Sequence, residues 1–96
     1  MSNVGIIATI RTQAGKEAEF EGVFAELAAA VRANEAGNSY YKLFRTGETG
    51  VYKVLECYDD EAAVDAHRAS DHFRTIGARL GPCLAGAPEI EKLAAA

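Results

Sequence analysis

The sequence predicts an α+β domain with the ferredoxin-like order β-α-β-β-α-β, in which helices cover one face of a four-stranded antiparallel sheet. Three observations support this fold. A strand-like apolar stretch opens the chain, two more flank a glycine-rich connector, and stretches with helical apolar spacing lie between and after them. With 96 residues, we expect a single domain over 1–96, because a chain of this length has no room for a second core.

The first half of the chain is typical of strand, helix and strand. Residues 4–11 (VGIIATIR) carry apolar side chains on both faces, which predicts a central strand. After the turn TQAG, a helix is predicted from Lys16 to about Asn34, and Gly37 is expected to end it in a left-handed conformation. The apolar stripe of this helix consists of Phe20, Val23, Phe24, Leu27 and Val31.

The second half begins with a hairpin. Residues 38–45 and 51–58 are predicted strands, and TGETG between them is a short glycine-rich connector. Asp59 or Asp60 can cap a short helix, and a second helix is expected to begin near Ser70, which is a good N-cap residue. The dipeptide GP at 81–82 should stop that helix, and a last strand is predicted over 87–93.

A sheet with helices on one face leaves its other face bare. Apolar residues alternate along both faces of the predicted strands, so the bare face should be partly apolar; we assign to it Ile7, Tyr41, Leu43, Val51 and Leu55. An exposed apolar face indicates a protein partner. We therefore predict a two-fold homodimer.

Composition argues against several classes of partner. The net charge is −4 and the pI about 5.1, and the Lys and Arg residues are scattered, whereas nucleic-acid binders usually carry a basic stripe. No stretch is long and apolar enough to span a bilayer, and no basic region precedes the first apolar run. We expect a cytoplasmic protein with no nucleic-acid or membrane partner. Cys57 and Cys83 match no CxxC spacing, so free thiols are favoured over a disulfide or a redox role.

The two histidines of the chain lie in HRASDHF, residues 67–73. A helical zinc pair needs histidines four residues apart, whereas positions five apart point about 140° away from each other. A cap at Ser70 would also place His67 and His72 on different helices, so no metal site is predicted. His72 is expected to be exposed or hydrogen-bonded.

His67 continues the inward stripe of Ala63 and Val64, so its ring should face the sheet and needs a polar partner. Candidate partners are Glu56, Tyr40 and Asn38. Both a satisfied core histidine and a pocket-lining histidine remain open.

The chain resembles the antibiotic biosynthesis monooxygenase family, in particular its small stand-alone quinol-monooxygenase-like members. The resemblance rests on YKVLECYDDEAAVDAHRASDHF, preceded by EAGNSYYKLFR and by IATIRTQAGKEAEF. It covers nearly the whole chain. The family pattern of E-x-Y, acidic residues and A-x-x-x-H-x-x-S-x-H-F is met here by Glu56, Tyr58, Asp59, Ala63, His67, Ser70, His72 and Phe73.

This resemblance implies a dimeric α/β barrel that oxidises a small aromatic quinol or polycyclic phenol with dioxygen, without metal, flavin or other cofactor. Its catalytic candidates are His67 as base or donor, Glu56 to fix the histidine tautomer, and Asn38 to orient an oxygen. The substrate-binding candidates are Tyr40, Tyr58, His72, Phe24, Phe44 and Phe73, with Phe20 as a further wall residue.

Haem degradation, which some relatives carry out, is not expected. In those relatives an asparagine lies on the first strand, a tryptophan near the position of His67, and a histidine further on. Here the corresponding positions are close to Ala8 and Gly77, and the chain has no tryptophan. Two other functions stay open: an isomerase or tautomerase of a small carbonyl compound, and a dimeric ligand-binding module without catalysis.

Overall fold

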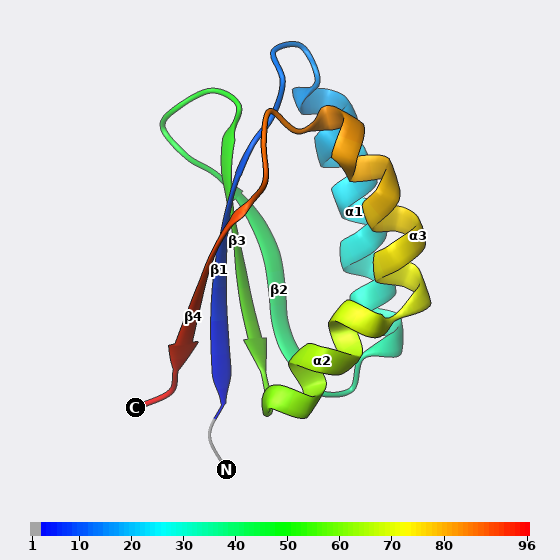
Figure 1. The fold of residues 1–96 in the computed structure, drawn as a ribbon, viewed down its shortest axis with the longest axis vertical. Helices are drawn as coiled ribbons and strands as arrows, with labels where there is room; N and C mark the ends of the chain where they lie inside the picture. The colour runs from blue at the N-terminus through cyan, green and yellow to red at the C-terminus, as the bar shows by residue number, and fades with distance from the viewer. Residues whose placement is uncertain (1–2) are drawn as a thin grey trace.

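The computed structural model describes residues 3–96 and has the predicted ferredoxin-like architecture, with the second helical region split in two (Figure 1). The four strands form one antiparallel sheet in the order β2-β3-β1-β4, so β1 is central as expected. The elements are β1 (Val4–Arg11), α1 (Glu17–Asn34), β2 (Asn38–Arg45), β3 (Val51–Tyr58), α2 (Glu61–Ala69), α3 (Asp71–Leu80), the short 3-10 helix η1 (Gly81–Cys83) and β4 (Glu89–Ala94). In the described part of the chain, no helix combines the length and the apolar character needed to cross a membrane.

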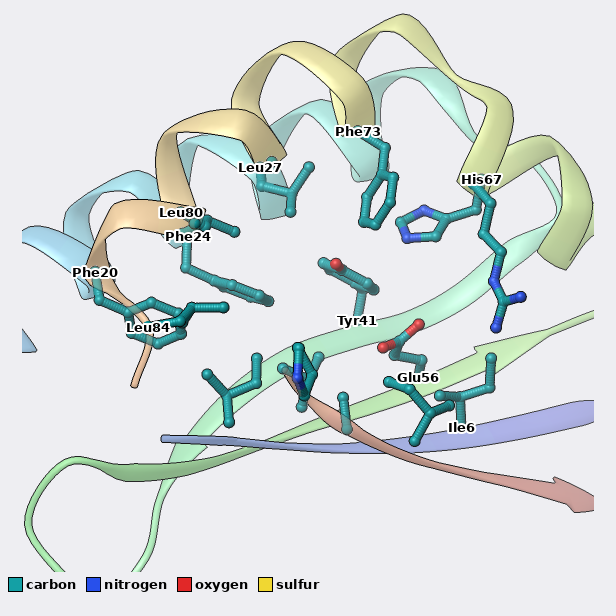
Figure 2. Close-up of a pocket in the computed structure, with 18 of the residues that line it drawn as sticks. Ile6, Phe20, Phe24, Leu27, Tyr41, Glu56, His67, Phe73, Leu80 and Leu84 are labelled. Carbon is teal, nitrogen blue, oxygen red and sulfur yellow. The ribbon is translucent and has the colours of Figure 1, made fainter. Parts of the chain in front are cut away.

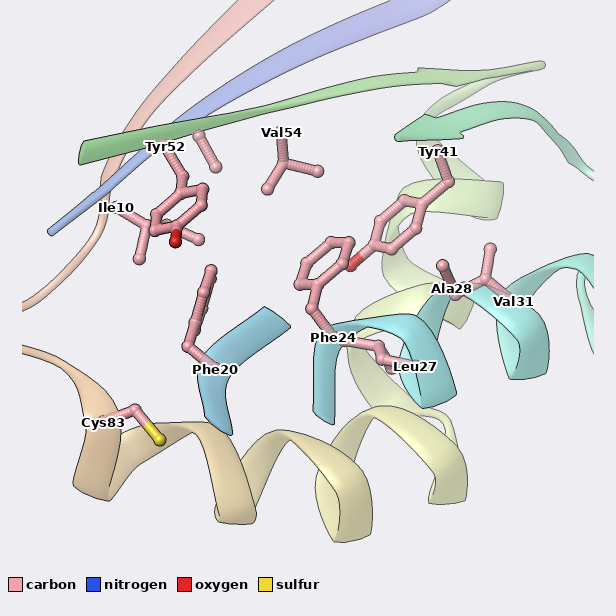
Figure 3. Close-up of a cluster of buried hydrophobic side chains, with 11 residues drawn as sticks. Ile10, Phe20, Phe24, Leu27, Ala28, Val31, Tyr41, Tyr52, Val54 and Cys83 are labelled. Atoms are coloured by element: carbon pink, nitrogen blue, oxygen red, sulfur yellow. The ribbon is translucent and has the colours of Figure 1, made fainter. Parts of the chain in front are cut away.

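The core lies between the sheet and the helices. In β1, alternate residues from Val4 to Ile10 face the helices and are buried, which is the expected period of a strand. Aromatic rings of α1 meet tyrosines of the sheet: Phe20 lies 4.9 Å from Tyr52, and Phe24 stacks on Tyr41 at 5.5 Å between ring centroids (Figure 3). These contacts fix α1 over the sheet and define one wall of the space described below.

Side-chain caps begin both α2 and α3: Ser70 was the predicted cap of α3, and Asp60 was one of the two residues predicted for α2. The Asp60 carboxylate accepts the Ala63 backbone N–H at 2.9 Å, and the Ser70 hydroxyl accepts the Phe73 N–H at 3.2 Å. Ser70 has an extended backbone, with φ −70° and ψ 149°, so the chain changes direction there. The segment that contains both histidines is therefore bent between them.

A β-bulge at the start of β2 corrects the predicted sheet faces. Asn38 pairs with Tyr58 and Tyr40 pairs with Cys57, so Ser39 is an extra residue. Beyond the bulge, Tyr41 pairs with Glu56 and both side chains face the helices. Tyr41 and Leu43, which were assigned to the bare face, therefore face the core.

The outer face of the sheet is uncovered in the single chain. Tyr40 and Phe44 of β2 and Leu93 of β4 are 44%, 38% and 43% exposed. Ile7, Val51 and Leu55 are half-buried on this same face, as predicted. The described chain thus presents a continuous, partly apolar sheet surface.

Gly37 does not take the predicted left-handed conformation, because its φ is not positive. Glu35, with an extended backbone, is the residue that follows the last turn of α1. Gly37 is instead a point of close approach between the α1–β2 loop and α2. A Cβ placed there would lie 2.7 Å from the Cβ of Ala63, closer than carbon atoms pack. The absence of a side chain lets α2 lie directly against this loop.

Gly37→Ala should lower the free energy of unfolding by about 1–3 kcal/mol, the usual effect of overpacking. Gly22→Ala is the matched control: Gly22 is exposed within α1 and a Cβ there meets nothing within 4 Å. That change should stabilise the protein by roughly 0.5–1 kcal/mol through helix propensity. Chemical denaturation of both variants measures the difference, and equal effects would rule out the proposed contact with Ala63.

Candidate active site

A largely apolar cavity of about 220 Å³ lies between the sheet and the helical layer (Figure 2). It extends from α1 and α3 to the edge strand β4, where Ile90 and the preceding Pro88 line it. Strand β1 contributes Ile6, Ala8 and Ile10, and the phenylalanines of the lining come from α1 and α3. Its apolar wall includes Ile6, Phe20, Phe24, Leu27, Phe73 and Leu80.

One end of the cavity is polar. Tyr41, Glu56, His67 and Arg68 line it together, although they come from β2, β3 and α2. Figure 2 shows the Glu56 carboxyl group and the His67 ring at this end of the cavity, with the Tyr41 ring beside them. A few polar groups at one end of an apolar cavity can orient a small ligand, while the apolar walls exclude water.

His67 is 5% exposed and is held by aromatic rings and by one carboxylate. Its ring centroid lies 4.7 Å from that of Phe73 and 5.3 Å from that of Tyr41. Its Nδ1 lies 2.9 and 3.1 Å from the two carboxylate oxygens of Glu35. A hydrogen bond from Nδ1–H to an ionised carboxylate leaves Nε2 as the ring's proton acceptor. The candidate partners expected for His67 were Glu56, Tyr40 and Asn38; the observed partner is Glu35.

Glu35 also binds the second histidine. His72 Nε2 makes a short hydrogen bond to Glu35 Oε2, the oxygen nearer to His67. Glu35 follows α1, His67 lies in the last turn of α2, and His72 in the first turn of α3. The bend at Ser70 therefore brings the two histidines to one carboxylate. The ligand atoms of these three residues lie within 4.8 Å of one another and are the group in this site that could hold a metal ion. The five-residue spacing of the two histidines had indicated that their rings point apart, so this convergence was not expected.

Glu56 is the carboxyl group of the cavity itself. Burial raises its pKa from 4.5 to about 7, against the lowering effects of the Tyr58 hydrogen bond and of the nearby Arg68 charge. The Tyr58 hydroxyl donates to Glu56 Oε1 at 2.6 Å. Glu56 can therefore both release and accept a proton near neutral pH.

Tyr41 is a polar group of the cavity that sequence reasoning missed as a site residue. Burial, and then the charges of Glu56 and Glu35, raise the pKa of its hydroxyl well above the usual value. It thus stays protonated and can donate a hydrogen bond to a ligand oxygen. Its position depends on the bulge at Ser39, which no residue pattern in NSYYKLFR indicates.

The remaining predicted site residues divide into three groups. Phe24 and Phe73 line the cavity, as does Phe20. Tyr40 and Phe44 lie on the outer face of the sheet, which corrects their assignment to the pocket. Three others lie near the cavity without lining it: Tyr58 is fully buried beside Glu56, the Asn38 amide donates to the Tyr40 carbonyl at 3.1 Å, and His72 binds Glu35.

Glu35 and Arg68 were also missed. Glu35 occurs in NEAG, a segment that reads only as a helix end, and its role arises from contacts 32 and 37 residues away in sequence. Arg68 directly follows His67 in α2, but adjacent residues of a helix point about 100° apart, so this position did not predict that Arg68 lines the cavity.

Comparisons with known proteins agree with the fold and with the resemblance stated above. The family model described as Antibiotic biosynthesis monooxygenase matches residues 3–79. The Bacillus subtilis (strain 168) protein called "Putative monooxygenase YcnE" is 37% identical over 82 residues, which is 84% of this chain and 84% of that protein.

Solved structures give the same result. A "putative antibiotic biosynthesis monooxygenase" from Caulobacter crescentus CB15 is 49% identical with a TM-score of 0.96, over 99% of this chain and 91% of that chain. A conserved protein from Methanosarcina mazei Go1 is 26% identical with a TM-score of 0.90, over 97% and 92% of the two chains. Rv0793 from Mycobacterium tuberculosis, at 23% identity and a TM-score of 0.89 over 98% and 95%, shares the fold.

The raised pKa of Glu56 predicts a pH dependence of stability. Because its pKa of about 7 in the folded protein exceeds the ordinary 4.5, the folded state holds this proton more tightly than the unfolded chain does. The stabilisation is complete below about pH 4.5 and is lost as the pH rises through 7, by up to about 3 kcal/mol. Glu56→Gln should remove this slope.

Denaturation by urea between pH 4.5 and 8 measures this pH dependence of the free energy of unfolding. Glu48→Gln in the exposed hairpin is the matched control. If the wild type and Glu56→Gln lose the same stability over this interval, Glu56 does not titrate there.

Proposed function

Because the chain belongs to the antibiotic biosynthesis monooxygenase family, we propose that it is a cofactor-independent monooxygenase that oxidises a small aromatic quinol or polycyclic phenol with dioxygen. Membership of this family supports a monooxygenase-like function, and the substrate class is our inference. The main support for this proposal is the cavity, which has apolar walls and is lined at one end by His67. Glu35 binds Nδ1 of His67, so Nε2 is left as a proton acceptor.

The proposed reaction begins with removal of the substrate's hydroxyl proton by His67 Nε2. The resulting anion is electron-rich and gives one electron to dioxygen, and the two radicals combine at a ring carbon that carries hydrogen. The peroxide takes a proton from His67 to form a hydroperoxide. Loss of that ring hydrogen as a proton, with cleavage of the O–O bond, leaves a carbonyl group and water. In sum, one phenol and one dioxygen give one quinone and one water, so the substrate supplies all the electrons.

The polar residues of the cavity have distinct proposed roles. Tyr41 donates a hydrogen bond to the substrate's oxygen, and Arg68 offsets its negative charge. Glu56, with its pKa near 7, exchanges the proton of the later steps. Phe20, Phe24 and Phe73 hold the ring. A cavity of about 220 Å³ favours a small aromatic compound, because the pockets that bind drug-sized ligands measure roughly 300–1,000 Å³.

A second candidate function is proton transfer without oxygen. A carboxyl group that titrates near pH 7 beside a histidine with a free Nε2 suits the isomerisation or tautomerisation of a small carbonyl compound. A third, a dimeric module that only binds an apolar ligand, would use the same walls without needing either group. Dioxygen consumption distinguishes the first function from the other two.

We propose in addition that the protein is a homodimer formed through the outer face of the sheet. That face exposes Tyr40, Phe44 and Leu93 beside the half-buried Ile7 and Leu55. An apolar surface of this kind on a chain of 96 residues favours a second copy, since small domains bury a limited share of their own surface. The free thiols of Cys57 and Cys83 are compatible with the cytoplasm, where thiols stay reduced.

Dioxygen uptake by the metal-stripped protein, measured against a panel of hydroquinones and polycyclic phenols, tests the oxidation. At least one compound should be consumed with one dioxygen per quinone formed. His67→Ala should reduce the rate about 10²-fold or more, the usual contribution of a general base. Arg74→Ala on the exposed surface of α3 is the control and should retain the wild-type rate.

Full activity of folded His67→Ala would contradict the role of His67 as base. No uptake on any compound would contradict the oxidation itself. Deuterium exchange next to the carbonyl of simple ketones would then support the isomerase, and ligand-induced thermal stabilisation without exchange would support the binding module.

Light scattering on a sizing column tests the dimer. The wild type should have twice the mass of one chain, and Leu55→Lys, which places a charge in the outer face, should shift it to the monomer at micromolar concentration. Ala29→Glu on the exposed side of α1 is the control and should stay dimeric. A monomeric wild type, or a Leu55→Lys variant that stays fully dimeric, would contradict an interface on this face.

A further inference from the structure

The geometry points to Glu35 and His72 as positioning residues for His67, in a buried histidine–carboxylate–histidine triad that fixes the proton acceptor of the cavity. This inference rests on the proposed function and extends it to two residues that do not touch the cavity. His67 lines the cavity, whereas Glu35 and His72 line a separate hollow of about 190 Å³ that also includes Asn34, Gly37 and Ser70. The triad therefore joins two spaces and acts on a substrate only through His67.

Hydrogen bonding determines the orientation of His67. Both Glu35 oxygens lie within 3.1 Å of Nδ1, so the proton of the neutral ring is held on that atom. Nε2 is then unprotonated and free to accept a proton from a ligand. Without the carboxylate, the ring could carry its proton on either nitrogen, and a protonated Nε2 cannot act as a base.

His72 gives the carboxylate a second partner. The Glu35 side chain is 9% exposed, and burial of an ionised carboxylate is unfavourable unless donors surround it. The Nε2–H of His72 donates to Oε2, the oxygen that is also closer to His67. His72 is itself fixed by the helix start at Ser70, which places it in the first turn of α3.

The charges of the triad suit a base that works in an apolar cavity. With both rings neutral and Glu35 ionised, the triad carries one negative charge. When Nε2 of His67 takes the substrate's proton, the imidazolium forms against that carboxylate and the net charge becomes zero. The proton stays on Nε2 until the peroxide takes it, so Glu35 need not be protonated at any step.

The same three residues offer the two nitrogens and one carboxylate of a zinc site. Their spacing favours protons over a metal ion. Ligand atoms around a tetrahedral zinc lie about 3.3 Å apart, given a Zn–N distance of about 2.0 Å, whereas His67 Nδ1 lies 2.9 Å from Glu35 Oε2 and His72 Nε2 is closer still. Metal addition is therefore one arm of the test.

Because the chain has two histidines, the nitrogen-15 spectrum of its imidazoles contains two rings only. In the metal-free wild type, with both rings neutral, we expect His67 to be protonated at Nδ1 and His72 at Nε2. A bound phenol should shift the Nε2 resonance of His67. In Glu35→Gln, an NH₂ donor replaces one acceptor oxygen and the negative charge is lost. The protonated Nδ1 of His67 is then less favoured, so at least one ring should become a mixture of tautomers. Glu48→Gln should leave both rings as in the wild type.

Kinetics supply the second readout. Glu35→Gln should lower kcat about 10²–10⁴-fold, as removal of the orienting carboxylate does in other histidine bases, with KM nearly unchanged because Glu35 does not line the cavity. His72→Gln keeps an N–H donor for Glu35 and should retain most of kcat. His72→Leu lacks the donor and should lose activity toward the level of Glu35→Gln.

The nitrogen-15 spectrum of the wild type tests the proposed tautomers of the triad even if a variant fails to fold or if no phenol is oxidised. A His67 protonated at Nε2, or unchanged tautomers and kcat in folded Glu35→Gln, would overturn the inference. So would stoichiometric Zn²⁺ binding that shifts both rings and raises the melting temperature. The expected tautomers without any dioxygen uptake would support the triad and contradict only the oxidation of phenols.

Discussion

The buried carboxylate of Glu35 is the constraint on which the site depends. It lies where α1 ends, and its oxygens meet imidazole nitrogens from α2 and α3. A carboxylate in this environment needs both donors, so the ends of three helices are tied to one point. That point also sets the angle at which the His67 ring enters the cavity.

The sheet contributes a second constraint through the bulge at Ser39. The extra residue places Tyr41 opposite Glu56 on the inner face and leaves Tyr40 on the outer face. Tyr41 then stacks on Phe24 and reaches the polar end of the cavity. One inserted residue thus decides both which tyrosine can meet a ligand and which apolar groups the outer face exposes.

These two constraints place polar groups of different kinds in one apolar space. Burial raises the pKa of Glu56 toward neutrality and keeps the Tyr41 hydroxyl protonated. His67 faces them with Nε2, because Glu35 binds the other ring nitrogen, Nδ1. Such an arrangement can remove a proton and hold the resulting anion away from water, which is what oxidation of an electron-rich aromatic by dioxygen requires.

Local sequence determined the elements of this protein, because their signals are short-range. Alternation in residues 4–11, the helical stripe that includes Phe20 and Leu27, and the caps at Asp60 and Ser70 each depend on neighbours within a few residues. The inward position of His67, and of Glu56 beside it, followed from the same periodicities. Tertiary structure alone decided what these side chains meet: Glu35 joins the histidines across more than 30 residues, and the bulge reverses the expected face of Tyr40 and Tyr41. Contacts over such distances and an inserted residue in a strand leave no periodic signal, so the partner of His67 emerged only when the helices were packed on the sheet.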